Sequence, residues 1–141
     1  MVALATFVVV RKDTLNGIDD RVGQLTRSHA NELAEWVREK QRITSSLKMA
    51  VGQAEPVPFL LAAKQAGAFD DTYFVYADKR NIFAHPMPDG YDGTARPWYK
   101  QAVQTGGPTL TPAYVDASTG KLTISFVEPV GPKGQPTAVV G

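Results

Sequence analysis

A long, uninterrupted helical pattern near the start of the chain limits the folds that are open to it. Between residues 14 and 50 no proline occurs, and apolar side chains recur mostly at spacings of three and four. This is the period of an α-helix with one apolar face. The apolar stripe consists of Leu15, Ile18, Val22, Leu25, Leu33, Trp36, Val37, Ile43 and Leu47.

Such a helix is longer than a compact core of this size requires, roughly 50 Å at about 1.5 Å per residue. We therefore expect a stalk helix over residues 13–52, with Asp13 or Thr14 as its N-cap. Because the apolar stripe extends past any globular core, we expect its first half to pair with a second copy of the chain in a homodimer.

The apolar residues 2–10 come before this helix and are followed by Arg11 and Lys12. A bilayer takes about 20 residues to cross, and a signal peptide would carry a basic region first and a cleavage site after. A buried strand would also explain the pattern. We expect instead that residues 1–12 are the end of a transmembrane helix or a leader segment.

The composition excludes several classes of function. Of 141 residues, 43% are hydrophobic and 21% charged, the net charge is +1, and cysteine is absent. These values are ordinary for a soluble globular domain, indicate no nucleic-acid partner, and exclude disulfides and thiol chemistry. Metal-ligand spacings, phosphate loops and nucleophile–base pairs are also missing. We therefore expect no enzyme, no metal and no cofactor.

The rest of the chain predicts short helices and strands. The helices are expected over residues 59–66 and 97–105, and the strands over residues 72–77, 82–84, 108–116, 121–130 and 137–140. Short connections between consecutive strands favour antiparallel pairing. The sequence thus predicts an α+β fold, in which the long N-terminal helix is followed by a five-stranded antiparallel sheet with short helices.

The segment from Pro86 to Tyr99 concentrates side chains suited to binding a carboxylate. It begins as a loop rich in proline and glycine and becomes a helix at Pro97, where the fixed φ of proline fits the first turn. A helix start favours an anion. Arg96 adds a guanidinium group, Trp98 an indole N–H and Tyr91 a hydroxyl group. The alternative is an ordinary packed loop, with Trp98 in the core and Arg96 paired to a loop aspartate.

Tyr114 and Asp116 are two residues apart in the third predicted strand, so a strand would point both to one face. They could therefore address one ligand together. The alternative is that Asp116 caps the turn that follows it.

The motif Arg-Pro-Trp-Tyr at residues 96–99 follows a Gly-Tyr-Asp loop and precedes Ala-Tyr-Val-Asp. In these features the chain resembles the Cache domains of bacterial chemoreceptors, above all the amino-acid-sensing double-Cache receptors of the methyl-accepting chemotaxis type. The resemblance is sharpest over residues 73–130. It implies a PAS-like Cache module over residues 53–141.

The resemblance also implies which residues bind ligand. In that family an arginine, a tryptophan and an upstream tyrosine, here Arg96, Trp98 and Tyr91, hold the ligand's carboxylate. A tyrosine and an aspartate on the next strand, here Tyr114 and Asp116, hold its amino group. A further family aspartate follows the last strand, and we expect it beyond the last residue of this sequence, so that the module is truncated at its C-terminus.

In function, the resemblance implies the periplasmic sensor domain of an inner-membrane chemoreceptor. Such a domain recognises a small amino acid or related carboxylate by its charged ends and signals across the membrane. Two alternatives remain open, because a fold alone does not determine function. One is the Cache sensor of a histidine kinase or diguanylate cyclase. The other is a structural or dimerisation module without a ligand.

Overall fold

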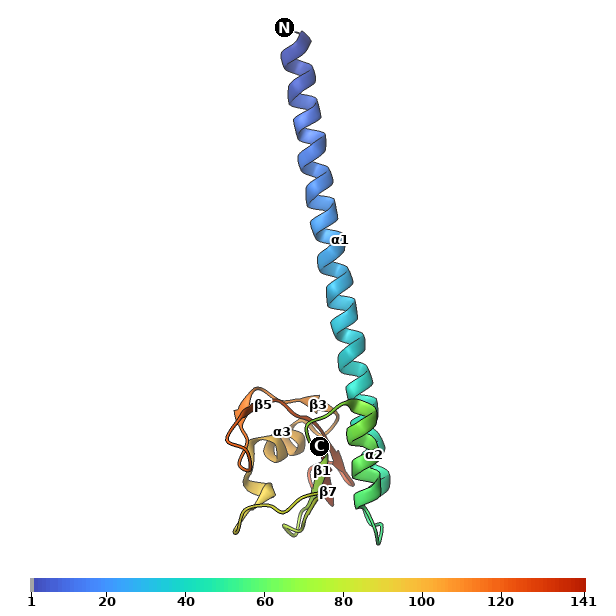
Figure 1. Cartoon of the computed structure of the whole chain (residues 1–141), viewed down its shortest axis with the longest axis vertical. Coiled ribbons are helices and arrows are strands. Elements are labelled where there is room, and N and C mark those ends of the chain that lie inside the picture. Colours follow the sequence, from blue (N-terminus) through green and yellow to red (C-terminus); the bar gives the residue numbers. More distant parts are fainter. Residues whose placement is uncertain (1) are drawn as a thin grey trace. The chain divides into compact units, whose positions relative to one another are not determined.

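The computed structural model describes the backbone of residues 2–141 and the side chains from residue 17 onward. The chain divides into two units between Val37 and Arg38. The long helix α1 spans Val2–Ser46 and is followed by the 3-10 helix η1 (Leu47–Ala50) (Figure 1).

The predicted long helix is present, but its predicted N-cap is wrong. The helix passes through Asp13 and Thr14, because neither proline nor glycine interrupts residues 2–13. The alternative of a buried strand over residues 2–10 is wrong for the same reason. Within the described residues, no helix combines the length and the apolar character needed to cross a membrane.

The second unit is built on a five-stranded sheet in the order β2-β1-β7-β6-β3, in which every neighbouring pair is antiparallel. The strands are β1 (Tyr73–Tyr76), β2 (Asn81–Phe83), β3 (Thr109–Leu110), β6 (Phe126–Val130) and β7 (Ala138–Val140). The first and last strands of the chain therefore lie side by side within the sheet. The predicted α+β fold with a five-stranded antiparallel sheet is confirmed.

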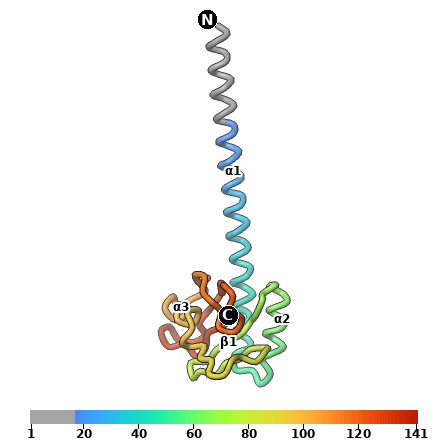
Figure 2. The backbone as a smooth tube through the Cα atoms, turned by 60° about the vertical axis from the view of Figure 1, so that its left-hand side comes forward, coloured from blue at the N-terminus to red at the C-terminus, as the bar shows by residue number. Residues whose placement is uncertain are grey.

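Two helices pack on opposite sides of these strands, α2 (Val57–Gly67) and α3 (Pro97–Thr105) (Figure 1, Figure 2). Successive side chains of β1 point to opposite faces of the sheet, as in any strand. Phe74 belongs to the cluster on the α2 side, and Tyr73 and Val75 belong to the cluster on the α3 side. Each face of the sheet thus has its own hydrophobic core.

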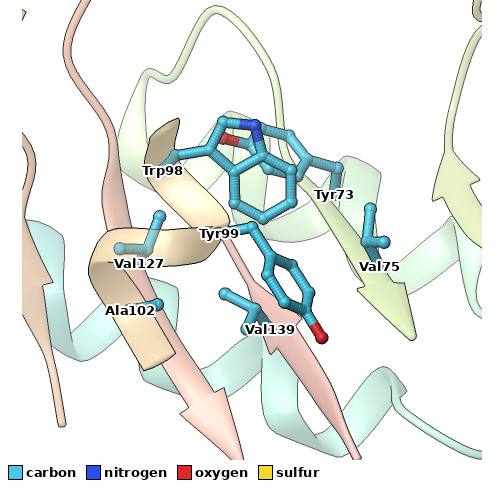
Figure 3. Close-up of a cluster of buried hydrophobic side chains, with 7 residues drawn as sticks. All are labelled: Tyr73, Val75, Trp98, Tyr99, Ala102, Val127 and Val139. Atoms are coloured by element: carbon cyan, nitrogen blue, oxygen red, sulfur yellow. The ribbon is translucent and has the colours of Figure 1, made fainter. Parts of the chain in front are cut away.

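The α3-side cluster joins the helix to three strands, as Figure 3 shows. Its buried members are Tyr73, Val75, Trp98, Tyr99, Ala102, Val127 and Val139. The rings of Tyr73 and Trp98 meet edge to face, with centroids 4.8 Å apart. Burial of each large apolar side chain contributes about 1.5–3 kcal/mol, so this cluster holds α3 firmly on the sheet.

The strands predicted over residues 108–116 and 121–130 are each broken in two, contrary to the prediction. Their outer halves form β3 and β6 in the main sheet. Their inner halves form a separate two-stranded hairpin of β4 (Tyr114–Val115) and β5 (Leu122–Thr123).

The break has the form of a β-bulge. Residues 111–113 separate β3 from β4, whereas only residues 124–125 separate β5 from β6. One strand therefore carries an extra residue, which bends the ladder and redirects the side chains beyond it. Pro112 lies in the longer segment and lacks an N–H to continue the ladder.

Candidate functional site

The start of α3 is prepared by a short 3-10 helix, η2 (Gly93–Ala95). The Asp92 carboxylate caps η2 by accepting a hydrogen bond from the Thr94 backbone N–H at 3.0 Å. Arg96 follows in an extended conformation and is the N-cap of α3, without a side-chain capping bond, and Pro97 is the first helical residue. The Arg96 side chain therefore does not cap the backbone N–H groups in the first turn of α3.

The Arg96 guanidinium group reaches across to the β4–β5 hairpin. Its Nη2 donates a hydrogen bond to the Val115 carbonyl oxygen at 2.6 Å, and its Cζ lies 6.0 Å from the centroid of the Tyr114 ring. The alternative in which Arg96 pairs with a loop aspartate is not what the structure shows. Asp92 pairs instead with Lys79, at 3.1 Å.

Trp98 is buried in the α3-side cluster, with 2% of its surface exposed. This part of the packed-loop alternative is therefore correct. Burial of the ring does not isolate Trp98 from the site, since its side chain acts on the Tyr91 hydroxyl group and lowers the pKa of that group. In Figure 3 the indole nitrogen lies at the side of the ring away from Val139.

Tyr91 is the residue at which the predicted site converges. Burial raises the pKa of its hydroxyl group to about 12, opposed by the hydrogen bond with Trp98 and by the charge of Arg96. Tyr114 and Asp116 act on the same hydroxyl group and raise its pKa further. Direct contacts join two of the predicted residues, since the Arg96 guanidinium group lies over the Tyr114 ring, and the charges of Arg96 and Asp116 both act on the Tyr91 hydroxyl group.

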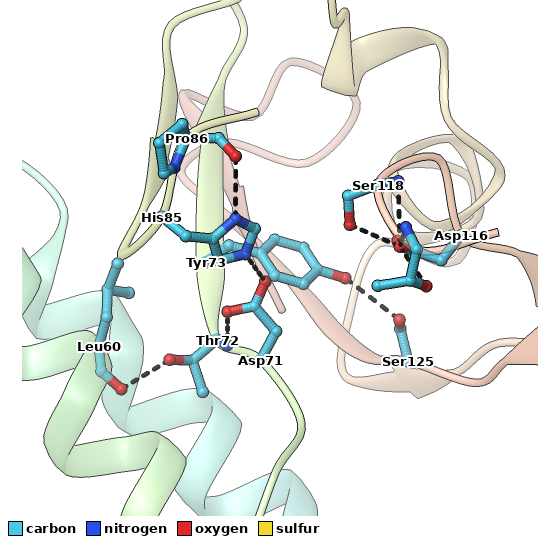
Figure 4. Close-up of polar contacts among 10 residues, drawn as sticks. Leu60, Asp71, Thr72, Tyr73, His85, Pro86, Asp116, Ser118 and Ser125 are labelled. Atoms are coloured by element: carbon cyan, nitrogen blue, oxygen red, sulfur yellow. Dashed lines mark hydrogen bonds and ion pairs between the residues drawn. The ribbon is translucent and has the colours of Figure 1, made fainter. Parts of the chain in front are cut away.

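Asp116 lies just after β4 and not within a strand, contrary to the prediction. Its Oδ2 accepts hydrogen bonds from the backbone N–H groups and hydroxyl groups of Ser118 and Thr119, at 2.6 to 3.1 Å (Figure 4). Turn capping, the alternative interpretation, is therefore present. Burial raises the pKa of Asp116, but these hydrogen bonds outweigh it and leave the pKa below its ordinary value.

Turn capping uses only one of the two carboxylate oxygens. Within the part of the chain that the structure describes, every hydrogen bond to the Asp116 carboxylate ends on Oδ2. The Oδ1 atom remains for a further donor, and the lowered pKa keeps the group charged at neutral pH.

Tyr114 is half-buried and ends in a cluster of hydroxyl groups that sequence reasoning missed. Its hydroxyl group lies 2.6 Å from Ser125 Oγ, and the Tyr73 hydroxyl group lies 3.1 Å from the same atom (Figure 4). Tyr73 was visible as part of a β-rich segment. A single serine carries no sequence signal of this kind.

His85 ties the loop before Tyr91 to the start of β1 (Figure 4). Its Nε2 lies 2.6 Å from Asp71 Oδ2, and its Nδ1 lies 3.1 Å from the Pro86 carbonyl oxygen. Both partners are acceptors, which only the doubly protonated ring can serve at once. The hydrogen bond to Asp71, followed by that to Pro86, accordingly raises the pKa of His85 above its ordinary 6.5.

The candidate site offers polar groups of several kinds. In the described residues, no group of three or more histidine, aspartate or glutamate side chains is placed to hold a metal ion. What the site does present is a guanidinium group, an indole N–H, two phenol groups and a carboxylate.

A model of the family described as methyl-accepting chemotaxis protein-like, first PDC sensor domain, matches residues 53–141. The chain belongs to this family. The resemblance to chemoreceptor sensor domains, predicted from the Arg-Pro-Trp-Tyr motif and its flanking segments, is thereby confirmed.

Individual chemoreceptors are similar to it over the whole chain. The methyl-accepting chemotaxis protein PscA of Pseudomonas syringae pv. tomato is 25% identical over 153 residues, which cover 100% of this chain and 24% of PscA. This sensor domain thus spans about a quarter of the length of that relative.

Solved structures share its fold. The ligand-binding domain of the Pseudomonas fluorescens chemoreceptor CtaA with L-isoleucine matches with a TM-score of 0.69 and 28% identity, over 81% of this chain and 50% of that one. The domain of the Pseudomonas aeruginosa amino acid chemoreceptor PctC with GABA matches with a TM-score of 0.73 and 23% identity, over 86% and 60%. The CtaA domain is also solved with L-alanine and with L-serine.

The Asp71–His85 pair predicts a pH dependence of stability. Because the pKa of folded His85 lies above 6.5, the pair contributes fully below pH 6.5, and this contribution is lost as pH rises through the raised pKa. We expect the change in unfolding free energy to be under about 1 kcal/mol, since both side chains are partly exposed. Urea unfolding over a pH series, with the pKa of His85 from NMR, measures it.

Asp71→Asn should lower the pKa of His85 and flatten this pH dependence. Asp70→Asn is the matched control, because it removes the same charge from the exposed neighbouring residue without touching His85. A pKa of His85 at or below 6.5 in the folded wild-type protein would contradict the assignment.

Proposed function

We propose that Tyr91 and four residues that act on its hydroxyl group bind a small α-amino acid by its two charged ends. The residues are Tyr91, Arg96, Trp98, Tyr114 and Asp116. We further propose that the domain lies in the periplasm as part of a membrane-anchored chemoreceptor, and that it releases its ligand unchanged. The family to which the chain belongs supports this setting.

The carboxylate of the ligand would bind at the start of α3. Arg96 supplies a planar guanidinium fork, the geometry that pairs best with a carboxylate. The positive end of the helix dipole adds to it. The indole N–H of Trp98 and the hydroxyl group of Tyr91 can donate to the same group, and the raised pKa of Tyr91 keeps its proton in place.

The ammonium group of the ligand would bind at Asp116. Its carboxylate stays ionised because its pKa is lowered, and Oδ1 is not used by the turn. Tyr114 lies two residues before it, in β4, and adds a hydroxyl oxygen and a flat ring. A site that hydrogen-bonds both charged ends rejects ligands that lack either, because its own polar groups would remain unpaired.

The structural relatives support this ligand class. The CtaA domain, 25 to 29% identical in these matches, is solved with L-isoleucine, L-alanine and L-serine. Their side chains differ in size and polarity, and what they share is the α-amino and α-carboxylate groups. The single observation that carries the proposal is that the Arg96 guanidinium group lies against Tyr114 and Val115 of β4, directly before the carboxylate of Asp116.

Arg96→Ala should abolish or greatly weaken amino acid binding while leaving the fold intact. Loss of the charge-assisted pairing costs about 1.5–3 kcal/mol or more, roughly ten- to a hundredfold in affinity. Titration calorimetry with L-isoleucine, L-alanine and L-serine measures it. Arg80→Ala is the matched control, because Arg80 is exposed and pairs with Asp78 outside the site. Equal affinity of the Arg96 variant and wild type would rule out the proposed carboxylate site.

We also propose that the chain forms a homodimer through α1. The apolar stripe leaves Ile18, Val22, Leu25 and Leu33 exposed, at 53%, 57%, 60% and 60% of their surface. Exposed apolar residues at helical spacing are typical of a helix that pairs with another helix. Leu15, also part of the predicted stripe, lies outside the described side chains.

Replacing both Val22 and Leu25 with glutamate should weaken self-association by about tenfold or more, because two large apolar side chains lose their burial. Sedimentation velocity over a concentration series measures it. Glutamate at Gln24 and Ser28 adds the same charge between the stripe positions and should weaken association much less. Monomeric wild-type protein at high concentration would refute the pairing.

A further inference from the structure

We propose that Ser125 is a positioning residue for the ligand site, which fixes Tyr114 and, through Tyr114, the guanidinium group of Arg96. This inference rests on the proposed function, since it concerns how the same site is held ready for its ligand. Ser125 itself is buried, with 8% of its surface exposed, and acts from behind the residues that face the ligand.

The Ser125 hydroxyl group is shared by two tyrosines from different strands. Its Oγ lies 2.6 Å from the Tyr114 hydroxyl group and 3.1 Å from that of Tyr73 (Figure 4). A serine hydroxyl group has one proton to donate and two lone pairs that accept, so this single group can serve both tyrosines at once. Removal of this single oxygen would therefore break two hydrogen bonds in a buried setting, where unpaired polar groups are most costly.

Ser125 is in turn held by the bulge that divides the long strands. Its backbone N–H donates to Thr111 Oγ1 at 3.0 Å, and its carbonyl oxygen accepts from the Thr111 N–H at 2.9 Å. Thr111 is buried as well, with 5% of its surface exposed. These two bonds fix the backbone of Ser125 and thereby aim its hydroxyl group at the tyrosines.

Tyr114 needs such an anchor because of where it lies. The β4–β5 hairpin is separate from the main sheet, and a two-stranded hairpin is only marginally stable by itself. The bond to Ser125 connects the Tyr114 side chain to residues at the edge of β6 and to Tyr73 of β1. Arg96 lies over the Tyr114 ring and donates to the neighbouring Val115 carbonyl oxygen, so its position depends on the same hairpin.

The test is Ser125→Ala, alone and combined with Tyr114→Phe, with affinity for L-isoleucine, L-alanine and L-serine measured by calorimetry. Ser125→Ala should weaken binding by about three- to tenfold. In the Tyr114→Phe background it should cause no further loss, because its effect passes through the Tyr114 hydroxyl group. Equal losses in the two backgrounds would overturn the proposal.

A control separates positioning from loss of stability. Thr72→Val removes a buried hydroxyl group that donates to the Leu60 carbonyl oxygen at 2.6 Å, on the α2 side of β1. It should lower the unfolding free energy much as Ser125→Ala does, but leave ligand affinity unchanged. If Thr72→Val weakens binding as strongly as Ser125→Ala, the effect of Ser125 is one of stability and the proposal is wrong.

A readout without ligand distinguishes this inference from the proposed function. The 13C shift of the Tyr114 ring carbon that bears the hydroxyl group reports its hydrogen bond and should change in Ser125→Ala. If wild-type protein binds none of these amino acids, the proposed function fails, while the shift still decides whether Ser125 holds Tyr114. If wild type binds and both the shift and the affinity are unchanged in the variant, the inference alone fails.

Discussion

The antiparallel pairing of β1 with β7 is the interaction on which the rest of the domain depends. Tyr73 and Gly141 exchange backbone hydrogen bonds of 2.8 and 2.9 Å, and the ladder continues through Val139 and Val140, which are fully buried. Closing so long a loop costs entropy, but that cost grows only slowly with loop length, and burial of apolar side chains offsets it. Because the β1–β7 pair lies inside the sheet, β1 is covered on both faces, with Tyr73 and Val75 in one core and Phe74 in the other. The α2-side core and the α3-side core both follow from that arrangement.

The proposed site joins a firmly packed element to a weakly supported one. Trp98 belongs to the core that holds α3 on the sheet, whereas Tyr114 and Asp116 belong to a small hairpin beyond the bulge. A ligand that contacts both α3 and the hairpin would help to hold the hairpin in place. Differential contact of this kind is what allows a ligand to shift the balance between two conformations. The bulge lies between the core and the proposed site, so a change in the hairpin on ligand binding would reach the main sheet through it.

The sequence predicts well those features that depend on local chemistry. The helix α3 spans residues 97–105 as expected, and the Arg-Pro-Trp-Tyr motif pointed to the family that the chain belongs to. The adjacency of β1 and β7 could not be read locally, because it depends on pairing between the two ends of the domain. Pro112 is a residue that interrupts strands, but a break there in the strand over residues 108–116 was not predicted from the sequence. No sequence pattern indicated a role for Ser125, because only folding brings Tyr73 and Tyr114 to its hydroxyl group.

A crystal structure of this chain with L-isoleucine would locate both ends of the ligand at once. We expect the ligand's carboxylate within hydrogen-bonding distance, about 2.7–3.2 Å, of the Arg96 guanidinium group and the Trp98 indole nitrogen. We expect its ammonium group to face Asp116 Oδ1. A ligand bound elsewhere, or bound here with its ends reversed, would rule out the proposed site.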